Sequence, residues 1–212
     1  MTPLELSVWP HLYSEGVGPV LLMLHGTGSS EEEIAGLAAR IDPAAAVLAP
    51  RGRVSENGAT RWFRRLAEGV FDVNDVIVRA GELAEFLGWA RAEYGLKDRE
   101  IVPVGFSNGA NIALALALLH PGVAPRAVAF SGMYPLGDRD APNPLVQSSV
   151  LLLNGASDAM APPASVDRLA DQLAARGAQV ERVTRAGGHG ITEEELVSAR
   201  RWLTRDASVH GI

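Results

Sequence analysis

The sequence predicts an α/β fold in which helices cover both faces of a mostly parallel sheet. Short apolar runs, such as residues 20–24 and 150–153, are typical of strands that are buried on both faces. Segments with apolar residues three and four apart separate these runs, which indicates that helices alternate with the strands. Of the 212 residues, 47% are hydrophobic. The chain can therefore bury a full core, and we expect a single domain over residues 1–212.

The start of the chain is predicted to form a strand–helix–strand unit. Val20 to Leu24 and Ala46 to Ala49 are the two apolar runs, and the second is stopped by a proline. Ser30 followed by Glu33 is the pattern of a capping box at a helix N-terminus, so a helix is expected between the strands. The preceding segment, Leu4 to Trp9, is expected to be an edge strand.

The middle of the chain is predicted to contain a long loop followed by a helix. Residues 51–73 are rich in Arg, Gly and Asn, which favours a loop. Residues 75–94 have the apolar spacing of an amphipathic helix, and Gly95 is positioned to end it.

The second half of the chain is predicted to alternate strands and helices. Residues 101–106 are expected to be a strand although Pro103 cannot donate a hydrogen bond to a sheet. Residues 108–119 are apolar on nearly all sides and predict a buried helix. The remaining expected elements are strands at 127–130, 150–153 and 180–184, a helix at 163–176, and a final helix that starts at the capping box of Thr192 and Glu195 and runs to about Thr204.

The segment Gly105-Phe106-Ser107-Asn108-Gly109 matches G-x-S-x-G, a tight turn between a strand and a helix. Glycine on both sides lets the turn close, and the strained backbone holds the Ser107 hydroxyl clear of the sheet. Because an apolar run precedes the motif and a buried helix follows it, we predict that Ser107 is a nucleophile. The alternative is an ordinary serine in a glycine-flanked turn.

A serine needs a base to become a good nucleophile, and five histidines are present. His11 and His210 lie in terminal segments, and His120 precedes a proline at a helix end. His189 follows the last strand within Gly187-Gly188-His189-Gly190, so we predict that it is the base. His25 is expected to be structural, with its ring bonded to nearby backbone.

An orienting carboxylate completes such a site. Asp158 follows the strand at 150–153 directly, so parallel strands would carry it to the same sheet edge as Ser107 and His189. Asp138 and Asp140 are competitors, but no strand comes immediately before them.

Two backbone N–H groups are expected to hold the negative charge that develops on a reacting carbonyl oxygen. One belongs to Asn108, the residue after the nucleophile, and the other to Thr27 in the loop after the first apolar run. Trp62 and Phe63, in the long loop, are candidates for substrate binding, with packing beneath the loop as an equally good alternative. Arg64 and Arg65 are expected to be solvated, with binding of an anionic substrate as the alternative.

Composition excludes several other kinds of site. The chain has 19 Lys and Arg against 25 Asp and Glu, a net charge of -6, and no basic cluster, so no nucleic-acid partner is expected. The absence of cysteine excludes a disulfide framework, a Cys-ligated zinc and a thiol nucleophile. No metal or cofactor is expected. The longest apolar run, at 112–119, is too short to cross a bilayer, and the N-terminal segment is not expected to be a signal peptide. We therefore expect a cytoplasmic protein without stable membrane association.

These residues resemble the α/β-hydrolase superfamily, and within it the small serine carboxylesterase/phospholipase group that includes acyl-protein thioesterases. The matching segments are L-H-G-T-G near residue 24, A-P-R-G near 49, G-F-S-N-G-A-N-I-A from 105, N-G-A-S-D from 154 and G-G-H-G from 187. The segment R-W-F-R-R-L-A-E-G-V-F-D, residues 61–72, is similar to bacterial carboxylesterases linked to hydroquinone resistance.

The resemblance implies an α/β-hydrolase fold with Ser107, Asp158 and His189 as a catalytic triad and with Thr27 and Asn108 as oxyanion donors. Many relatives carry Leu where this chain has Thr27, so the acyl pocket is expected to differ. Dienelactone hydrolases are similar in size, but they use Cys at the position of Ser107.

The expected function is a carboxylesterase that cleaves small carboxylic esters through an acyl-enzyme. The alternatives are a lysophospholipase or acyl-protein thioesterase and, in a different class, a non-catalytic binding protein on the same fold. Prolines at 135, 142 and 144 predict that no helical lid forms between residues 132 and 149, so the site should be open and shallow. The sequence leaves open whether the chain forms a homodimer.

Overall fold

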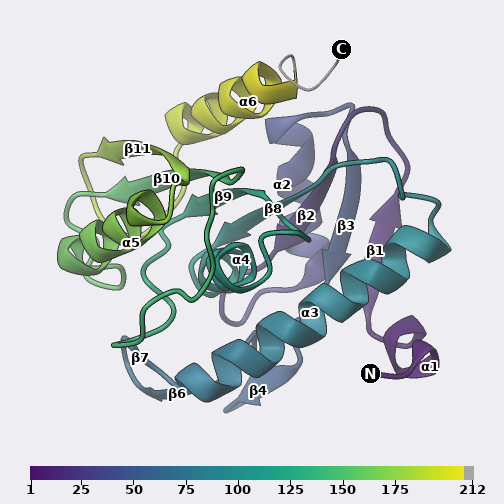
Figure 1. The fold of residues 1–212 in the computed structure, drawn as a ribbon, viewed down its shortest axis with the longest axis horizontal. Helices are drawn as coiled ribbons and strands as arrows, with labels where there is room; N and C mark the ends of the chain where they lie inside the picture. The colour runs from purple at the N-terminus through teal and green to yellow at the C-terminus, as the bar shows by residue number, and fades with distance from the viewer. Residues whose placement is uncertain (208–212) are drawn as a thin grey trace.

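A seven-stranded sheet runs through the middle of the computed structural model, which describes residues 1–207 (Figure 1). Its strand order is β1-β3-β2-β8-β9-β10-β11. β1 is antiparallel to β3, and every other neighbouring pair is parallel, as the apolar runs predicted. The strands are β1 (His11–Ser14), β2 (Val20–Leu24), β3 (Ala46–Pro50), β8 (Ile101–Phe106), β9 (Arg126–Phe130), β10 (Ser149–Gly155) and β11 (Gln179–Arg185).

Helices cover both faces of this sheet (Figure 1). α3 (Val73–Glu93), α4 (Asn108–Leu119) and α5 (Pro163–Ala175) pack on one face, and α2 (Glu31–Ile41) and α6 (Glu193–Ala207) pack on the other.

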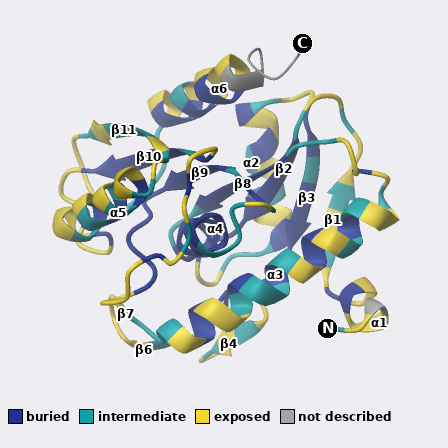
Figure 2. Ribbon diagram, viewed as in Figure 1, coloured by how far each residue is buried: buried dark blue, intermediate teal, exposed yellow. Residues whose placement is uncertain are grey.

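Strand β2 shows why the strands read as continuous apolar runs. Val20, Leu22 and Leu24 belong to the core under α3, α4 and α5, whereas Leu21 and Met23 belong to the core under α2 and α6. Successive side chains of a strand point to opposite faces, so a strand covered on both sides buries every residue. Figure 2 shows the same burial across the central strands and around α4.

The helix starts follow the capping patterns of the sequence. Thr192 and Glu195 form both halves of a capping box, because Thr192 N–H donates to Glu195 Oε2 at 2.8 Å and Glu195 N–H donates to Thr192 Oγ1 at 3.4 Å. Ser30 caps α2 by accepting from Glu33 N–H at 3.3 Å. The Glu33 carboxylate accepts instead from Ser29 Oγ, so only the Ser30 half of that box forms.

Pro103 does lie in a central strand. It pairs with Leu22 of β2, but the register of β8 with β9 begins only at Val104. The residue that lacks an N–H therefore falls outside the ladder with β9, which explains how a strand between two neighbours tolerates it.

The N-terminal segment differs from the prediction. Residues 4–9 were expected to form an edge strand, but Pro3–Ser7 form a short helix, α1, and the edge strand β1 comes later. The reason is a capping box: Thr2 Oγ1 accepts from Glu5 N–H at 3.3 Å, and Glu5 Oε2 accepts from Thr2 N–H at 2.7 Å. Proline at the first helical position adds to this start signal.

The segment at 51–73 is also more ordered than the predicted loop. It forms two small hairpins, β4 (Val54–Glu56) with β5 (Ala59–Arg61), and β6 (Arg65–Ala67) with β7 (Val70–Phe71). Strands of two or three residues are too short to show a period-two pattern. The Asn57-Gly58 turn, where φ is 51° and 83°, is the sequence signal that identifies the first hairpin.

Residues 131–148, between β9 and β10, contain neither a helix nor a strand. The expected absence of a helical lid in this segment is therefore confirmed for the described part of the chain. None of the helices within residues 1–207 is long and apolar enough to cross a membrane.

Candidate active site

The predicted site residues gather at the carboxyl edge of the sheet. From β2 the chain passes to β3 on one side and later returns to β8 on the other, so the strand order reverses between β2 and β8. Open parallel sheets bind ligands at such a switch point, because the flanking loops separate there. Thr27 follows β2, Ser107 follows β8, Asp158 follows β10 and His189 follows β11.

Ser107 occupies a strained turn between β8 and α4. Its φ of 55° and ψ of -117° lie where a non-glycine residue is rarely found. A Cβ atom at Gly105 would lie 2.2 Å from the carbonyl oxygen of Gly109, and one at Gly109 would lie 1.9 Å from that of Leu24. Both glycines of the motif are therefore required by close backbone packing, which explains how the turn holds its strained serine.

His189 and Asp158 are in direct contact. Nδ1 of His189 lies 2.8 Å from Oδ2 of Asp158, whose side chain is buried. The other carboxylate oxygen, Oδ1, accepts from the backbone N–H groups of Met160 and Ala161 at 2.9 and 3.1 Å. The carboxylate is thus fixed on both sides. Nε2 of His189 is buried and has no hydrogen-bond partner among the described residues.

The loop that carries His189 is held by Arg185, a contact the sequence did not reveal. Nη2 of Arg185 donates to the carbonyl oxygens of Gly188 and Gly190 at 2.9 and 3.0 Å, on either side of His189. Its Nε lies 2.9 Å from Glu195, which is buried at the start of α6. Ser131 Oγ donates to the Gly190 carbonyl at 3.1 Å. The loop is therefore positioned by side chains from three elements or their ends.

The competing carboxylates lie elsewhere. Asp138 and Asp140 are exposed and lie 3.7 and 4.0 Å from Arg168, in the segment between β9 and β10. Neither contacts His189 within the described part of the chain. Their position in the chain also differs from that of Asp158, because no strand ends directly before them.

His25 is a structural histidine, as expected. Its Nε2 accepts from Gly52 N–H at 2.9 Å, so Nδ1 is the protonated nitrogen and donates to the Gly26 carbonyl at 2.8 Å. Burial lowers the pKa of His25 from its ordinary value. His11 is the first residue of β1 and bonds to Tyr94, and His120 ends α4, whereas His210 lies outside the described residues.

The two residues whose N–H groups are expected to hold the oxyanion line the same pocket as Ser107. Asn108 is the first residue of α4, where a backbone N–H has no partner within the helix. Thr27 lines the same pocket. The side chains of both residues are used to hold the surrounding loops: Thr27 Oγ1 accepts from Arg61 Nη1 at 2.9 Å, and Asn108 Oδ1 accepts from Trp62 N–H at 2.8 Å.

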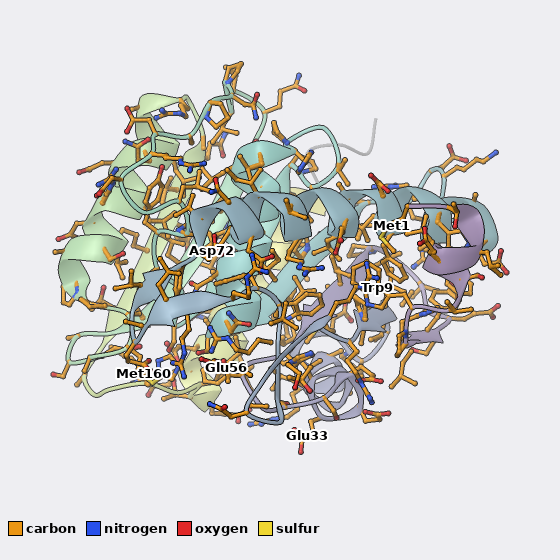
Figure 3. All side chains as sticks on the ribbon, turned by 90° about the horizontal axis from the view of Figure 1, so that it is seen from below. Met1, Trp9, Glu33, Glu56, Asp72 and Met160 are labelled. Carbon is orange, nitrogen blue, oxygen red and sulfur yellow. The ribbon has the colours of Figure 1, made fainter. Side chains whose placement is uncertain are left out.

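A cavity of about 270 Å³ joins these groups. Ser107 and His189 both line it, together with Thr27 and Asn108. Arg61, Arg65, Glu68 and Phe71 of the two hairpins form another part of the wall, and Met160 also lines the cavity. In Figure 3, Met160 and Glu56 lie toward the same end of the molecule, away from Met1 and Trp9.

Trp62 and Phe63 are not part of this wall. Trp62 is 2% exposed and Phe63 is fully buried, and neither lines the cavity. The indole N–H of Trp62 donates to the His25 carbonyl at 2.9 Å, and the ring of Phe63 packs on Phe71. The structure therefore favours the packing alternative for both aromatic residues. Of the two neighbouring arginines, Arg64 is exposed and pairs with Asp72, whereas Arg65 reaches the cavity.

Comparison with known proteins identifies relatives over most of the chain. A family model described as phospholipase/carboxylesterase matches residues 14–205. MhqD of Bacillus subtilis (strain 168), which is named as a hydrolase, is 36% identical over 193 residues, covering 91% of this chain and 96% of MhqD.

Solved structures of carboxylesterases are also similar to this chain. The crystal structure of a Bacillus cereus carboxylesterase is 37% identical, with a TM-score of 0.88, and the match covers 97% of this chain and 99% of that one. A carboxylesterase from Mesorhizobium loti is 32% identical, with a TM-score of 0.80 and 88% of each chain covered. The match therefore extends along nearly the whole chain in sequence and in fold, and this protein belongs to the phospholipase/carboxylesterase family.

Proposed function

We propose that the protein is a serine esterase that hydrolyses small carboxylic esters, with Ser107 as nucleophile, His189 as base and Asp158 as the group that orients His189. One observation carries the proposal. A histidine whose Nδ1 is fixed by a buried carboxylate has its Nε2 unpartnered, in the same pocket as a serine held in a strained turn. This is the arrangement that a serine needs to lose its proton as it attacks.

The reaction that follows from these positions has two halves. Ser107 Oγ attacks the ester carbonyl carbon while Nε2 of His189 takes the hydroxyl proton, and the backbone N–H groups of Asn108 and Thr27 stabilise the oxyanion. The C–O bond to the alcohol then breaks, and the alcohol leaves with that proton. Water attacks the resulting acyl-enzyme by the same route, which releases the carboxylic acid and restores Ser107.

A fluorophosphonate probe, which reacts with an activated serine, tests the assignment. We expect one covalent adduct on Ser107, identified by mass spectrometry of the labelled peptide. Ser107→Ala should abolish labelling and lower kcat by about 10⁶, as in other serine hydrolases. Ser198→Ala is the control, because Ser198 lies on α6 and does not line the pocket, and this variant should still be labelled. Labelling of Ser107→Ala at the wild-type rate would refute the proposal.

A second candidate, hydrolysis of lysophospholipids or acyl-protein thioesters, is favoured by apolar side chains near the pocket. Leu66 and Val70 of the β6–β7 hairpin are 74% and 51% exposed, and Met160 is 49% exposed. Such side chains could contact an acyl chain outside the cavity. The same acyl-enzyme chemistry would serve thioesters, so rates on matched oxygen and sulfur esters distinguish the two substrates.

A further inference from the structure

Arg61 is a buried cation in the wall of the active-site pocket. Its side chain is 4% exposed, yet it lines the cavity that also holds Ser107 and His189. Burial is the main cause that lowers the pKa of Arg61 from its ordinary value, followed by the nearby charge of Arg65. Arginine nevertheless stays charged in proteins. A positive charge with little water around it thus lies in the site.

The backbone around Arg61 is fixed from several sides. Thr60 C=O accepts from Gly28 N–H at 2.9 Å, which ties β5 to the loop of Thr27. Gly52 packs so closely that a Cβ atom there would lie 2.4 Å from the Arg61 carbonyl oxygen. Trp62 N–H is bound to Asn108. Arg61 is therefore held in place before any substrate arrives, which lowers the cost of binding.

The guanidinium of Arg61 has only part of its hydrogen-bonding capacity in use. Nη1 donates to Thr27 Oγ1 at 2.9 Å, and Nε donates to the Phe63 carbonyl at 3.3 Å and lies 3.3 Å from Glu56 Oε2. Nη2 has no partner among the described residues. Nη2 is not fully buried, so this edge of the guanidinium is free to donate to a ligand that enters the pocket.

The other charged residues of the pocket wall are more fully paired than Arg61. Arg65 also lines the pocket, but its Nε donates to Glu56 at 2.9 Å and its Nη1 is paired with Glu68. Glu68, the acidic residue of the described pocket wall, is therefore paired already. Two nitrogens of Arg65, Nε and Nη1, are therefore held by carboxylates of this chain, whereas at Arg61 only Nε lies beside a carboxylate among the described residues, and Arg61 is the more deeply buried of the two.

A second donor lies on the α4 side of the pocket. Asn111 lines the cavity and is buried, and its Oδ1 accepts from Met133 N–H at 2.8 Å. Its Nδ2 has no partner among the described residues. An arginine edge and an amide donor that line the same cavity fit an oxygen-rich anion better than an alkyl chain.

We propose that Arg61, assisted by Asn111, binds a carboxylate carried by the substrate, so that the enzyme prefers small esters with a second, ionised carboxyl group. The proposal rests on the proposed esterase function for the reacting ester. It adds that monoesters of short dicarboxylic acids are the preferred class.

Two esters of the same shape test this preference. Monomethyl succinate ends in a carboxylate, and methyl isocaproate ends in an isopropyl group of the same shape. The reacting methyl ester is the same in both. Arg61 also orients Thr27, so its loss can weaken the oxyanion site, but that effect acts on both esters alike. The ratio of their kcat/KM values therefore isolates recognition of the carboxylate.

We expect the wild-type ratio to favour monomethyl succinate by about tenfold or more, the range for hydrogen bonds to a charged group. Arg61→Met should reduce the ratio at least about tenfold. Arg61→Lys should keep part of the preference, because it keeps the charge without the planar fork. Arg64→Gln is the control, and the preference should persist because Arg64 is exposed, pairs with Asp72 and does not line the cavity.

A binding measurement separates this inference from the proposed function. Calorimetry with the Ser107→Ala variant should detect monomethyl succinate, and adding Arg61→Met should weaken that binding. An Arg61→Met ratio equal to the wild-type ratio, or binding that does not change with Arg61, would overturn the role of Arg61. Failure of the wild type to hydrolyse either ester would contradict the esterase proposal, while the calorimetry would still decide the carboxylate site.

Discussion

The backbone N–H of Trp62 donates a hydrogen bond to the side-chain oxygen Oδ1 of Asn108 at 2.8 Å, and its indole N–H donates to the His25 carbonyl at 2.9 Å. Trp62 thus connects the hairpin segment to the start of α4 and to the end of β2. Asn108 and Thr27, whose N–H groups we propose as oxyanion donors, lie at these two places. Trp62, a candidate for substrate binding in the sequence, is instead a buried residue that holds together the segments around the site.

Trp62→Phe should destabilise the protein more than it alters substrate binding. The change removes the donor for the buried His25 carbonyl but keeps the backbone bond to Asn108. Leaving a buried acceptor unsatisfied costs about 1–3 kcal/mol, so the free energy of unfolding in urea should fall by about that amount. KM for a small ester should stay close to wild type, because Trp62 does not line the pocket. A large rise in KM with no change in the free energy of unfolding would indicate that Trp62 contacts the substrate.

Asp158→Asn should lower kcat by about 10⁴, the loss seen for this change in a serine protease. The asparagine oxygen can still accept from Met160 and Ala161, which leaves its NH₂ facing Nδ1 of His189. Nδ1 must then accept, so the ring proton moves to Nε2, which can no longer take the proton of Ser107.

Asp138→Asn is the matched control for that experiment, since Asp138 is exposed and lies near Arg168. Its kcat should remain within a few-fold of wild type, as is usual for a surface substitution. If Asp138→Asn were the damaging change and Asp158→Asn the mild one, the assignment of the orienting carboxylate would be incorrect.

Stability should fall as the pH is lowered below about 6.5, the ordinary pKa of histidine. Burial lowers the folded-state pKa of His25, and it also lowers the pKa of His120. The unfolded chain therefore binds protons more readily than the folded one, and acid favours unfolding. Protonation of His25 would also break the bond from Gly52 N–H to Nε2.

Urea unfolding from pH 7 to pH 5 measures this effect. One such histidine contributes a slope of at most about 1.4 kcal/mol per pH unit. His25→Gln should reduce the slope, and His120→Gln should reduce it further when the two are combined. A His25→Gln protein with the wild-type slope would show that His25 is not a source of the acid sensitivity.

The sequence predicted the parts of the molecule in which one local signal controls the structure. The apolar strands, the G-x-S-x-G turn and the capping box at Thr192 are such cases, because each depends on neighbouring residues. Asp158 and His189 were placed by topology, since residues that follow parallel strands share one edge of the sheet. Their contact at 2.8 Å follows from that rule.

The pocket wall could not be predicted in the same way. Arg61 reaches the cavity because β4 and β5 pair over three residues each, because Gly52 lets the hairpin pack closely, and because Gly28 N–H donates to the Thr60 carbonyl. No periodic pattern in residues 51–73 encodes that packing. Arg185 likewise positions the His189 loop by donating to backbone carbonyls. Every residue has a backbone carbonyl, so no residue type in the sequence indicates such a contact.

The esterase should prefer short, soluble acyl chains and should not be activated at a lipid–water interface. The cavity has a volume of about 270 Å³, and its wall includes Arg61, Arg65, Glu68 and Asn111. Each CH₂ contributes about 0.8 kcal/mol only when it leaves water, and a polar wall that lacks a helical cover leaves most of a long chain hydrated. Leu66 and Val70 stand in solvent on one hairpin and cannot surround a chain by themselves.

The measurement is kcat/KM across p-nitrophenyl esters from acetate to palmitate, with the long-chain esters measured below and above the concentration at which they aggregate. We expect a maximum among the shorter esters and no rise in rate when micelles form. Leu66→Ser is a useful companion variant, because it removes an exposed apolar side chain that does not line the cavity. Its rates on short esters should match wild type. A maximum at palmitate that is lost in Leu66→Ser would show that the hairpin holds an acyl chain, and it would favour the lysophospholipase or thioesterase candidate over the short-ester enzyme.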